Sequence, residues 1–499
     1  MSSTQRWPEQ GWALLHLLLV ASFSEAEEPV CTQRGDPEIP QMFKDGDIML
    51  GGIFSFHSSW KNRRDSYMDK PLPLQCTSLD FRGFQFAQAM LFALEEINNS
   101  TDLLPGISLG YRIYDSCGSI AKSVRVALAF ANGNEIVSQP SEVPCTRPAQ
   151  VQAIMGERSS SPCMAMATAI GPFHIPMISH FATCACLSDK SKYPSFLRTI
   201  PSDYYQSRAL AQLVKHFGWT WVGAIRTNDD YGNNGMATFT ETAQQLGICL
   251  ETDPPDKIQK IIDIIKASTS KVIIAFLSGM DLDVILHEFS RNNLTGYQWV
   301  GSEGWIFDSQ IAAVDKHHIL DGAIGLSIPK AHVSGMREFM LDVRPLNVSS
   351  NEMFTTFYET LFSCKFKQSK SSSRNQKECT GREDLTVVQN IFTDMSLMPI
   401  FNNVYKGVYA AAHALHFILS CNKTCNTKMQ LDPFTHIRTI QFKTKEGEEV
   451  YFNENGDPAA KYEIINWKPR ENEFVEFVTV GLYDASYLQT NSYICKMRL

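Results

Sequence analysis

Short apolar runs alternate with segments of helical periodicity along this chain, and this alternation constrains the fold more than any other feature. Each apolar run has the length of a buried strand, and each segment between runs repeats its apolar residues at helical spacing. In the first set the runs lie at residues 46–56, 109–117, 151–155 and 175–179, with helical patterns at 81–98, at 119–131 and from residue 159 onward. The order β-α-β-α-β-α predicts a parallel sheet with helices on both faces.

A second set of the same kind follows. Its strand patterns lie at residues 219–227, 271–278 and 298–303, and its helical patterns at 208–218, 234–247, 258–268 and 281–291. Because 499 residues exceed one ordinary core, we expect two separate sheets. Two doubly wound parallel sheets in one chain suggest a hinged α/β clamshell. Such sheets bind ligands at the carboxyl ends of their strands.

The pattern loosens from about residue 323 onward. Residues 369–384 are polar and predict a mobile loop that is held by Cys364 and Cys379. Residues 404–421 return to helical periodicity, and residues 440–467 predict a hairpin that feeds a strand.

Charge and motifs exclude several classes of function. The net charge of -8 is mild for this length and argues against a nucleic-acid binder, which usually has a basic face. The sequence contains no zinc-type CxxC pair, no Walker A loop and no GxGxxG turn.

The first 26 residues have the pattern of a secretory signal peptide. Arg6 precedes an apolar run at residues 12–23, and a small-x-small cleavage pattern ends at Ala26. All 13 cysteines follow Ala26, which in an exported chain indicates disulfides, and the odd count leaves at least one thiol unpaired within the chain. No later run approaches 18 apolar residues, so no membrane span is expected. Glycosylation sequons fit the same compartment and occur at Asn98, Asn99, Asn293, Asn347 and Asn422.

A glycine, three serines and a proline stand between the strand pattern at 151–155 and the next helical pattern. Serine is a strong N-cap, and proline fits the first helical position, so Ser159–Ser161 predict the start of a helix. The free backbone amides at such a start attract anions.

Seven segments, in matching order and spacing, resemble the extracellular domain of class C G-protein-coupled receptors. They are residues 46–54, 81–98, 109–117, 195–203, 219–232, 301–305 and 455–467. The resemblance runs roughly from Gly46 to Asp484 and is closest to the calcium-sensing, vomeronasal type-2 and fish olfactory amino-acid receptor group. It implies a two-lobed Venus flytrap module, similar to bacterial periplasmic binding proteins, that closes on a small ligand.

The resemblance also implies a division of the chain. Residues 27–45 form a leader, 46–201 and 329–455 form the first lobe with a loop at 365–385, and 202–328 and 456–485 form the second lobe with its hinge. Residues 486–499 depart from the family pattern, which usually continues into a cysteine-rich domain and seven membrane helices. We therefore expect a fragment or a truncated form, on the extracellular side of the plasma membrane or secreted.

The family pattern implies a site for an amino-acid zwitterion. Ser160, Thr183 and the backbone at Phe181 would hold the head group, Asp203 and Tyr231 would hold the ammonium, and Glu303 would complete the site from the second lobe. Weaker candidates are Ser278 in the second lobe and, for the distal pocket, Arg82 and Phe86.

Plainer roles stay open for all of these residues. The serines at 159–161 and Asp203 are also good helix caps, and Thr183 and Glu303 also fit strand ends. Tyr231, Arg82 and Phe86 also fit ordinary packing. Ser160 with a histidine would suit a secreted hydrolase, but its surroundings are not G-x-S-x-G, and His174 and His180 fit structural positions.

The resemblance implies disulfides Cys76–Cys117, Cys364–Cys379 and Cys421–Cys425, and an intersubunit role for Cys145. Cys249 normally pairs with the cysteine-rich domain. Cys184 and Cys186 depart from the family and either pair or stay free, while Cys31, Cys163 and Cys495 stay unassigned. Glu157 and Arg158 also depart from a smaller, more neutral turn, and we expect them to alter ligand preference.

The expected function is a ligand-sensing receptor ectodomain, not an enzyme. The expected ligand is an L-amino acid. Calcium is a candidate second ligand, at sites that the resemblance does not transfer, and no other cofactor is expected. The expected partner is a second class C subunit, met through the apolar faces of residues 81–98 and 123–137. A G protein would be reached only through a membrane domain. The alternative is a soluble amino-acid-binding or decoy protein.

Overall fold

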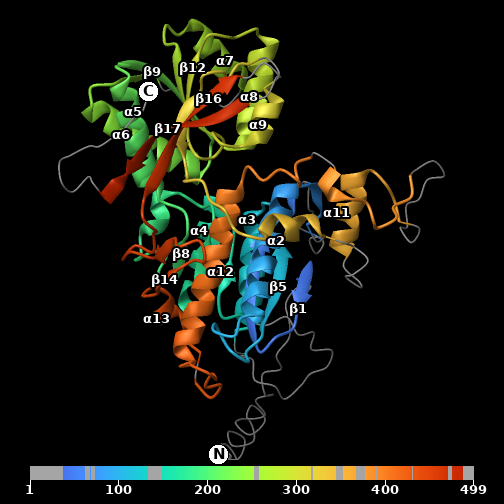
Figure 1. Ribbon diagram of the computed structural model, residues 1–499. Helices are drawn as coiled ribbons and strands as arrows, with labels where there is room; N and C mark the ends of the chain where they lie inside the picture. The colour runs from blue at the N-terminus through green and yellow to red at the C-terminus, as the bar shows by residue number, and fades with distance from the viewer. Residues whose placement is uncertain are drawn as a thin grey trace, which may run out of the picture.

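The computed structural model describes residues 38–61, 68, 74–132, 149–251, 258–315, 318–343, 352–366, 377–387, 390–429, 431–469 and 475–486. These residues form two α/β lobes, one above the other in Figure 1. Each lobe has its own largely parallel sheet, so the predicted bilobed architecture is confirmed. The signal-peptide region, most of the leader, residues 487–499, Cys31, Cys145, Cys495 and Asn347 lie outside the described residues.

The first lobe contains a six-stranded sheet in the order β1-β5-β2-β6-β7-β8. Its strands are β1 (Met42–Lys44), β2 (Ile48–Phe54), β5 (Leu109–Asp115), β6 (Ile154–Met155), β7 (Met177–Ser179) and β8 (Phe196–Arg198). All neighbours are parallel except β1, which runs antiparallel to β5. Strand β1 falls inside residues 27–45, the predicted leader, because buried Met42 anchors an edge strand there.

Helices cover both faces of this sheet. On one face α2 (Phe81–Asn98) packs against α12 (Met398–Ile418), and on the other α3 (Ile120–Asn132) packs against α4 (Ser160–Ile170). The chain thus returns to the first lobe for α12, the orange helix in Figure 1.

The second lobe contains a seven-stranded sheet in the order β10-β9-β11-β12-β13-β16-β17. Its parallel strands are β9 (Trp221–Arg226), β10 (Cys249–Glu251), β11 (Val272–Phe276), β12 (Gln298–Gly301) and β13 (Ile324–Ser327). Antiparallel β16 (Lys461–Pro469) and β17 (Val475–Asp484) complete it, shown in red in Figure 1. Its helices are α5 (Asp203–His216), α6 (Asp230–Gln245), α7 (Ile258–Ala267), α8 (Gly279–Arg291) and α9 (Ser309–Val314).

Smaller elements complete the two lobes. Two hairpins pair β3 (His57–Trp60) with β4 (Cys76–Leu79) and β14 (Gln441–Lys443) with β15 (Glu449–Tyr451). Short helices are α10 (Met336–Leu341), α11 (Glu352–Phe362) and α13 (Pro433–Ile437), and 3-10 turns lie at Gly171–Phe173, Ala185–Ser188 and Leu385–Val387. None of the helices in the described part of the chain combines the length and apolar composition that a membrane span requires.

Candidate functional site

The carboxyl ends of strands from both sheets carry the polar residues that the sequence singles out. Ser160 begins α4 after β6, Thr183 follows β7, and Asp203 begins α5 after β8. From the second lobe, Tyr231 lies in the first turn of α6, and Glu303 follows β12. Ser160, Thr183, Asp203 and Glu303 are all buried.

The start of α4 keeps its backbone amides available. Ser159 is the N-cap residue, but its side chain makes no capping hydrogen bond. A capping side chain bonds the amide of the second or third helical residue, and here the third is Pro162, which has none. The prediction that proline takes the first helical position was therefore wrong. Ser160 Oγ accepts a hydrogen bond from the Cys184 amide at 3.2 Å, which ties α4 to the loop after β7.

Ser202, and not Asp203, caps helix α5. Its hydroxyl accepts a hydrogen bond from the Tyr204 amide at 3.3 Å, which corrects the alternative that Asp203 is the cap. Asp203 is fully buried, and neither of its carboxylate oxygens has a hydrogen-bond partner among the residues that the structure describes. Its amide donates to the Thr183 carbonyl at 2.8 Å. A buried carboxylate in this state is costly unless it is protonated or gains a positive partner.

Glu303 is a second buried carboxylate at the same place. Burial raises the pKa of Glu303 to about 7, while Gln206 and the Thr183 hydroxyl beside it oppose the shift. Burial, and then the charge of Glu303, raise the pKa of Asp203 well above its ordinary value. Oxygen Oε2 of Glu303 and both amide atoms of Gln206 also have no hydrogen-bond partner within the described ranges.

Tyr231 is the second-lobe aromatic residue that the sequence assigns to the same site as Asp203 and Glu303. Its hydroxyl lies 2.7 Å from Ser302 Oγ, and its ring packs against Phe276 with centroids 4.7 Å apart. Burial, and then the charges of Glu303 and Asp203, raise the pKa of Tyr231.

A buried arginine fixes the loop that carries Thr183. Arg198 Nε lies 2.6 Å from Asp457 Oδ1, and both side chains are almost fully buried. The same guanidinium donates to the carbonyls of Ala182 at 3.2 Å and Cys184 at 2.9 Å. One side chain therefore holds the site loop against the last connection between the lobes.

The weaker candidates have other contacts. Ser278 caps α8, accepting from the Asp281 amide at 3.2 Å, and Phe86 packs on His180 with centroids 4.7 Å apart. Arg82 pairs with Asp308 and Asp394, each at 2.7 Å. Phe181 is half-buried, and its amide makes a long bond of 3.4 Å to Ser179 Oγ.

Glu157 and Arg158 are engaged within the first lobe. Ser55 Oγ donates to Glu157 Oε1 at 3.0 Å, and Ser116 Oγ also donates to this carboxylate. Arg158 Nη2 lies 2.7 Å from Asp80 Oδ2. Burial between aromatic rings lowers the pKa of His180 to about 3, so this histidine is neutral and fits the structural position expected of it. His174 likewise stacks on Phe434.

Sequence reasoning missed Gln206 and Ser302. Gln206 follows Asp203 by three residues on α5, a spacing that puts both on one helix face, and Ser302 directly precedes Glu303. Both signals are local, but polar residues at such spacings are too common to single out without the fold.

The structure contains the three disulfides that the resemblance implies, and it also pairs Cys184 with Cys186. Among the described cysteines Cys163 is unpaired and buried, and Cys249 is unpaired and exposed. Asn99, Asn293 and Asn422 are exposed, whereas the Asn98 amide makes two hydrogen bonds to the Leu109 backbone.

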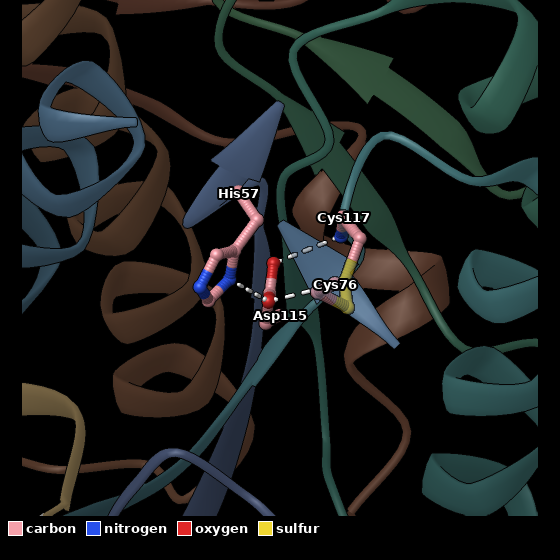
Figure 2. Close-up of side chains that lie close together, drawn as sticks. All are labelled: His57, Cys76, Asp115 and Cys117. Atoms are coloured by element: carbon pink, nitrogen blue, oxygen red, sulfur yellow. Dashed lines mark hydrogen bonds and ion pairs between the residues drawn. A yellow bond between two sulfur atoms is a disulfide. The ribbon is translucent and has the colours of Figure 1, made fainter. Parts of the chain in front are cut away.

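One group of side chains has the composition of a metal site but is already engaged. Figure 2 shows His57, Cys76, Asp115 and Cys117 close together at the end of β5. The two cysteines form a disulfide, and Asp115 accepts from the Cys117 amide at 2.8 Å while His57 Nδ1 lies 2.6 Å from its other oxygen. Calcium prefers oxygen ligands, so this group does not fit that ion.

The start of α4 offers backbone amides on the first lobe, and Asp203 and Glu303 offer buried carboxylates near the second. This arrangement is typical of a two-lobed ligand-binding domain. Residues 85–470 match the model of the receptor family ligand binding region. The chain belongs to this family, in the class C G-protein-coupled receptor group. The curated proteins that it matches are receptors and not enzymes.

Named relatives place the chain within that group. It is similar to the extracellular calcium-sensing receptor of Sus scrofa, with 34% identity over 91% of this chain and 46% of that receptor. Against the same receptor of Homo sapiens the identity is 34% over 88% of this chain and 45% of the receptor. Metabotropic glutamate receptor 4 of Mus musculus is 30% identical over 94% of this chain and 53% of that receptor. The chain thus spans about half the length of the curated relatives it matches.

Proposed function

We propose that this chain senses a small zwitterion, an L-α-amino acid, between its two lobes. The observation that carries the proposal is the pair of buried carboxylates Asp203 and Glu303, in which both oxygens of Asp203 and Oε2 of Glu303 lack hydrogen-bond partners within the described residues. A ligand ammonium supplies the positive charge and the hydrogen-bond donors that this pair needs.

The start of α4 supplies the opposite end of the site. A ligand carboxylate would lie against the first backbone amides of α4 and the Ser160 hydroxyl, where the helix dipole favours a negative charge. The ring of Tyr231 would face the ammonium and add a cation–π interaction of about 0.5–2 kcal/mol. A second candidate cation is Ca²⁺, because one relative is named the calcium-sensing receptor. The carboxylate oxygens of Asp203 and Glu303 are ligands of the kind that calcium prefers.

Closure of the lobes would be the signal. First-lobe groups such as Ser160 and Thr183 hold the ligand in both the open and the closed form. The second-lobe residues Glu303 and Tyr231 contact it only in the closed form and so stabilise that form. A ligand shifts this equilibrium only by its preference for the closed form.

In this proposal the chain pairs with a second receptor subunit, either the same chain or another class C chain, and closure of the lobes changes the contact between the two subunits. Helix α3 exposes Ile120 and Leu128, which suit such a contact. The apolar face of α2 was a wrong prediction for this contact, because it is buried against α12. Coupling to a G protein through a membrane domain, and a place outside the cell, belong to the same proposal. A soluble binding protein is the alternative.

Thermal-shift titration of the full secreted chain tests the proposal. We expect some L-amino acids to raise the melting temperature, and the matching α-hydroxy acids and decarboxylated amines to raise it much less. Titration with calcium chloride, alone and together with each amino acid, shows whether the melting temperature responds to Ca²⁺ or to the ammonium of the amino acid. Asp203→Asn should abolish the amino-acid shift, while Asp263→Asn, an exposed carboxylate on α7, should keep it. An unchanged shift in Asp203→Asn overturns the site.

A further inference from the structure

One arginine joins the two lobes through partners that the proposed amino-acid site does not use. Arg82 stands at the start of α2 in the first lobe, and its Nη2 atom lies 2.7 Å from Asp308 Oδ1 and 2.7 Å from Asp394 Oδ2. Asp394 belongs to the first lobe, in the segment that precedes α12. Asp308 belongs to the second lobe, where it is the N-cap of α9. The Arg82–Asp308 ion pair therefore crosses between the lobes.

Other contacts cross at the same place. Ser309 Oγ of the second lobe donates to Asp394 Oδ2 at 2.6 Å, and Gln310 Nε2 lies 3.4 Å from the same oxygen. The Ser309 amide also lies 3.5 Å from Ser396 Oγ of the first lobe. Asp394 thus accepts from both lobes at once.

The two halves of this network are held in place before they meet. In the first lobe, Gln85 Nε2 donates to the Phe392 and Asp394 carbonyls at 2.8 and 2.9 Å, and the Ser396 amide donates to Asp394 Oδ1 at 3.0 Å. In the second lobe, the Gln310 amide donates to Asp308 Oδ1 at 2.9 Å. Little side-chain freedom remains to be lost when the lobes come together.

Burial makes the network stronger than a surface ion pair. The side chains of Arg82, Asp308 and Asp394 are 10%, 21% and 17% exposed. The Arg82 charge, with hydrogen bonds from Ser309 and the Ser396 amide, lowers the pKa of Asp394 against the effect of burial. The carboxylate is therefore charged at neutral pH and retains its attraction for Arg82.

We propose that Arg82, Asp308, Asp394 and Ser309 form an interlobe lock that holds the cleft closed by contacts of the chain itself. Because the lock needs no ligand, it sets the population of the closed state on which a ligand acts. A lock of this kind raises the apparent affinity for a ligand that binds the closed form, since less of its binding energy goes into closure.

The test is single-molecule FRET on the full chain with no ligand added. Dyes are placed at exposed Lys260 on α7 and exposed Lys423 after α12 through bio-orthogonal amino acids, which leaves the disulfides intact. Asp308→Asn removes the charge that crosses between the lobes but keeps a good N-cap for α9. The matched control is Asp321→Asn, a second-lobe carboxylate that pairs with His318 of the same lobe at 3.4 Å.

We expect the wild-type chain to be mostly closed and Asp308→Asn to raise the open-to-closed ratio roughly fivefold, the change that the loss of one partly buried ion pair produces. Ser309→Ala should raise it by a smaller factor, and Asp321→Asn should leave it unchanged. A wild-type chain that is already open, or an Asp308→Asn chain with the wild-type ratio and an unchanged circular dichroism spectrum, overturns the lock. Since no ligand is present, neither result depends on the amino-acid site.

Discussion

The carboxylates of Asp203 and Glu303 are both buried and lie close enough that the charge of Glu303 makes Asp203 harder to ionise. Asp203 starts the first helix after the crossing into the second lobe, and Glu303 follows strand β12. Both are almost completely buried, and the Thr183 hydroxyl from the first lobe lies beside both. Such a pair is unfavourable in an empty site and favourable around a cation, which suits a sensor whose two states must differ.

The pH dependence of stability should report Glu303. Its folded-state pKa of about 7 lies above the ordinary value of 4.5, so the folded chain holds this proton more tightly than the unfolded chain. The stability that this proton provides is complete below about pH 4.5 and is lost as the pH rises through 7. We expect the free energy of unfolding to fall by an order of 1–3 kcal/mol over that window, measured by chemical unfolding without ligand. Glu303→Gln should flatten the fall, and Glu241→Gln, at an exposed carboxylate on α6, should not; equal slopes in all three chains contradict the assignment.

Two substitutions at Tyr231 should separate its ring from its hydroxyl. Tyr231→Phe loses the contact with Ser302 Oγ but keeps the aromatic face, so we expect amino-acid affinity to change by less than about threefold. Tyr231→Ala removes the face, and we expect a loss of about 3- to 30-fold by isothermal titration calorimetry. Equal losses in both variants would show that the ring does not contact the ammonium.

Arg198 should be the most sensitive of these positions for stability. Arg198→Met leaves Asp457 buried without its partner and frees the carbonyls of Ala182 and Cys184, so we expect a loss of about 3–5 kcal/mol in the free energy of unfolding. The control Arg291→Met breaks an exposed pair with Glu288 and should cost less than about 0.5 kcal/mol. Similar costs for the two variants would contradict the anchoring role.

The two helix-cap serines should behave differently. Ser202→Ala removes the hydrogen bond to the Tyr204 amide and should cost about 1 kcal/mol. Ser159→Ala removes no capping bond, and its cost should stay within about 0.5 kcal/mol of zero. Thermal melts of the two variants side by side measure the difference, and a larger cost at Ser159 would contradict the cap assignments.

Much of the fold follows from the sequence because buried parallel strands and amphipathic helices carry strong periodic signals. The segment at residues 81–98 predicts helix α2 with its observed bounds. Strand β1 was missed because a three-residue edge strand buries only Met42 and has no period to detect.

The site was less predictable, and the reason differs from residue to residue. Ser202 and Asp203 are adjacent and both are good caps, so only the fold shows which side chain bonds the helix and which is left for a ligand. Arg82 was a weaker candidate for the distal pocket, and the sequence did not reveal its partners Asp308 and Asp394, which lie 226 and 312 residues away. No local pattern specifies a pairing over such a separation.

The most direct test of the central claim is a crystal structure of the chain with the amino acid that gives the largest thermal shift. The account predicts the ligand nitrogen within about 3.2 Å of a carboxylate oxygen of Asp203 and of Glu303, and the ligand carboxylate at the Ser160 end of α4. A ligand bound outside the interlobe cleft, or bound there with its ammonium turned away from both carboxylates, would contradict it.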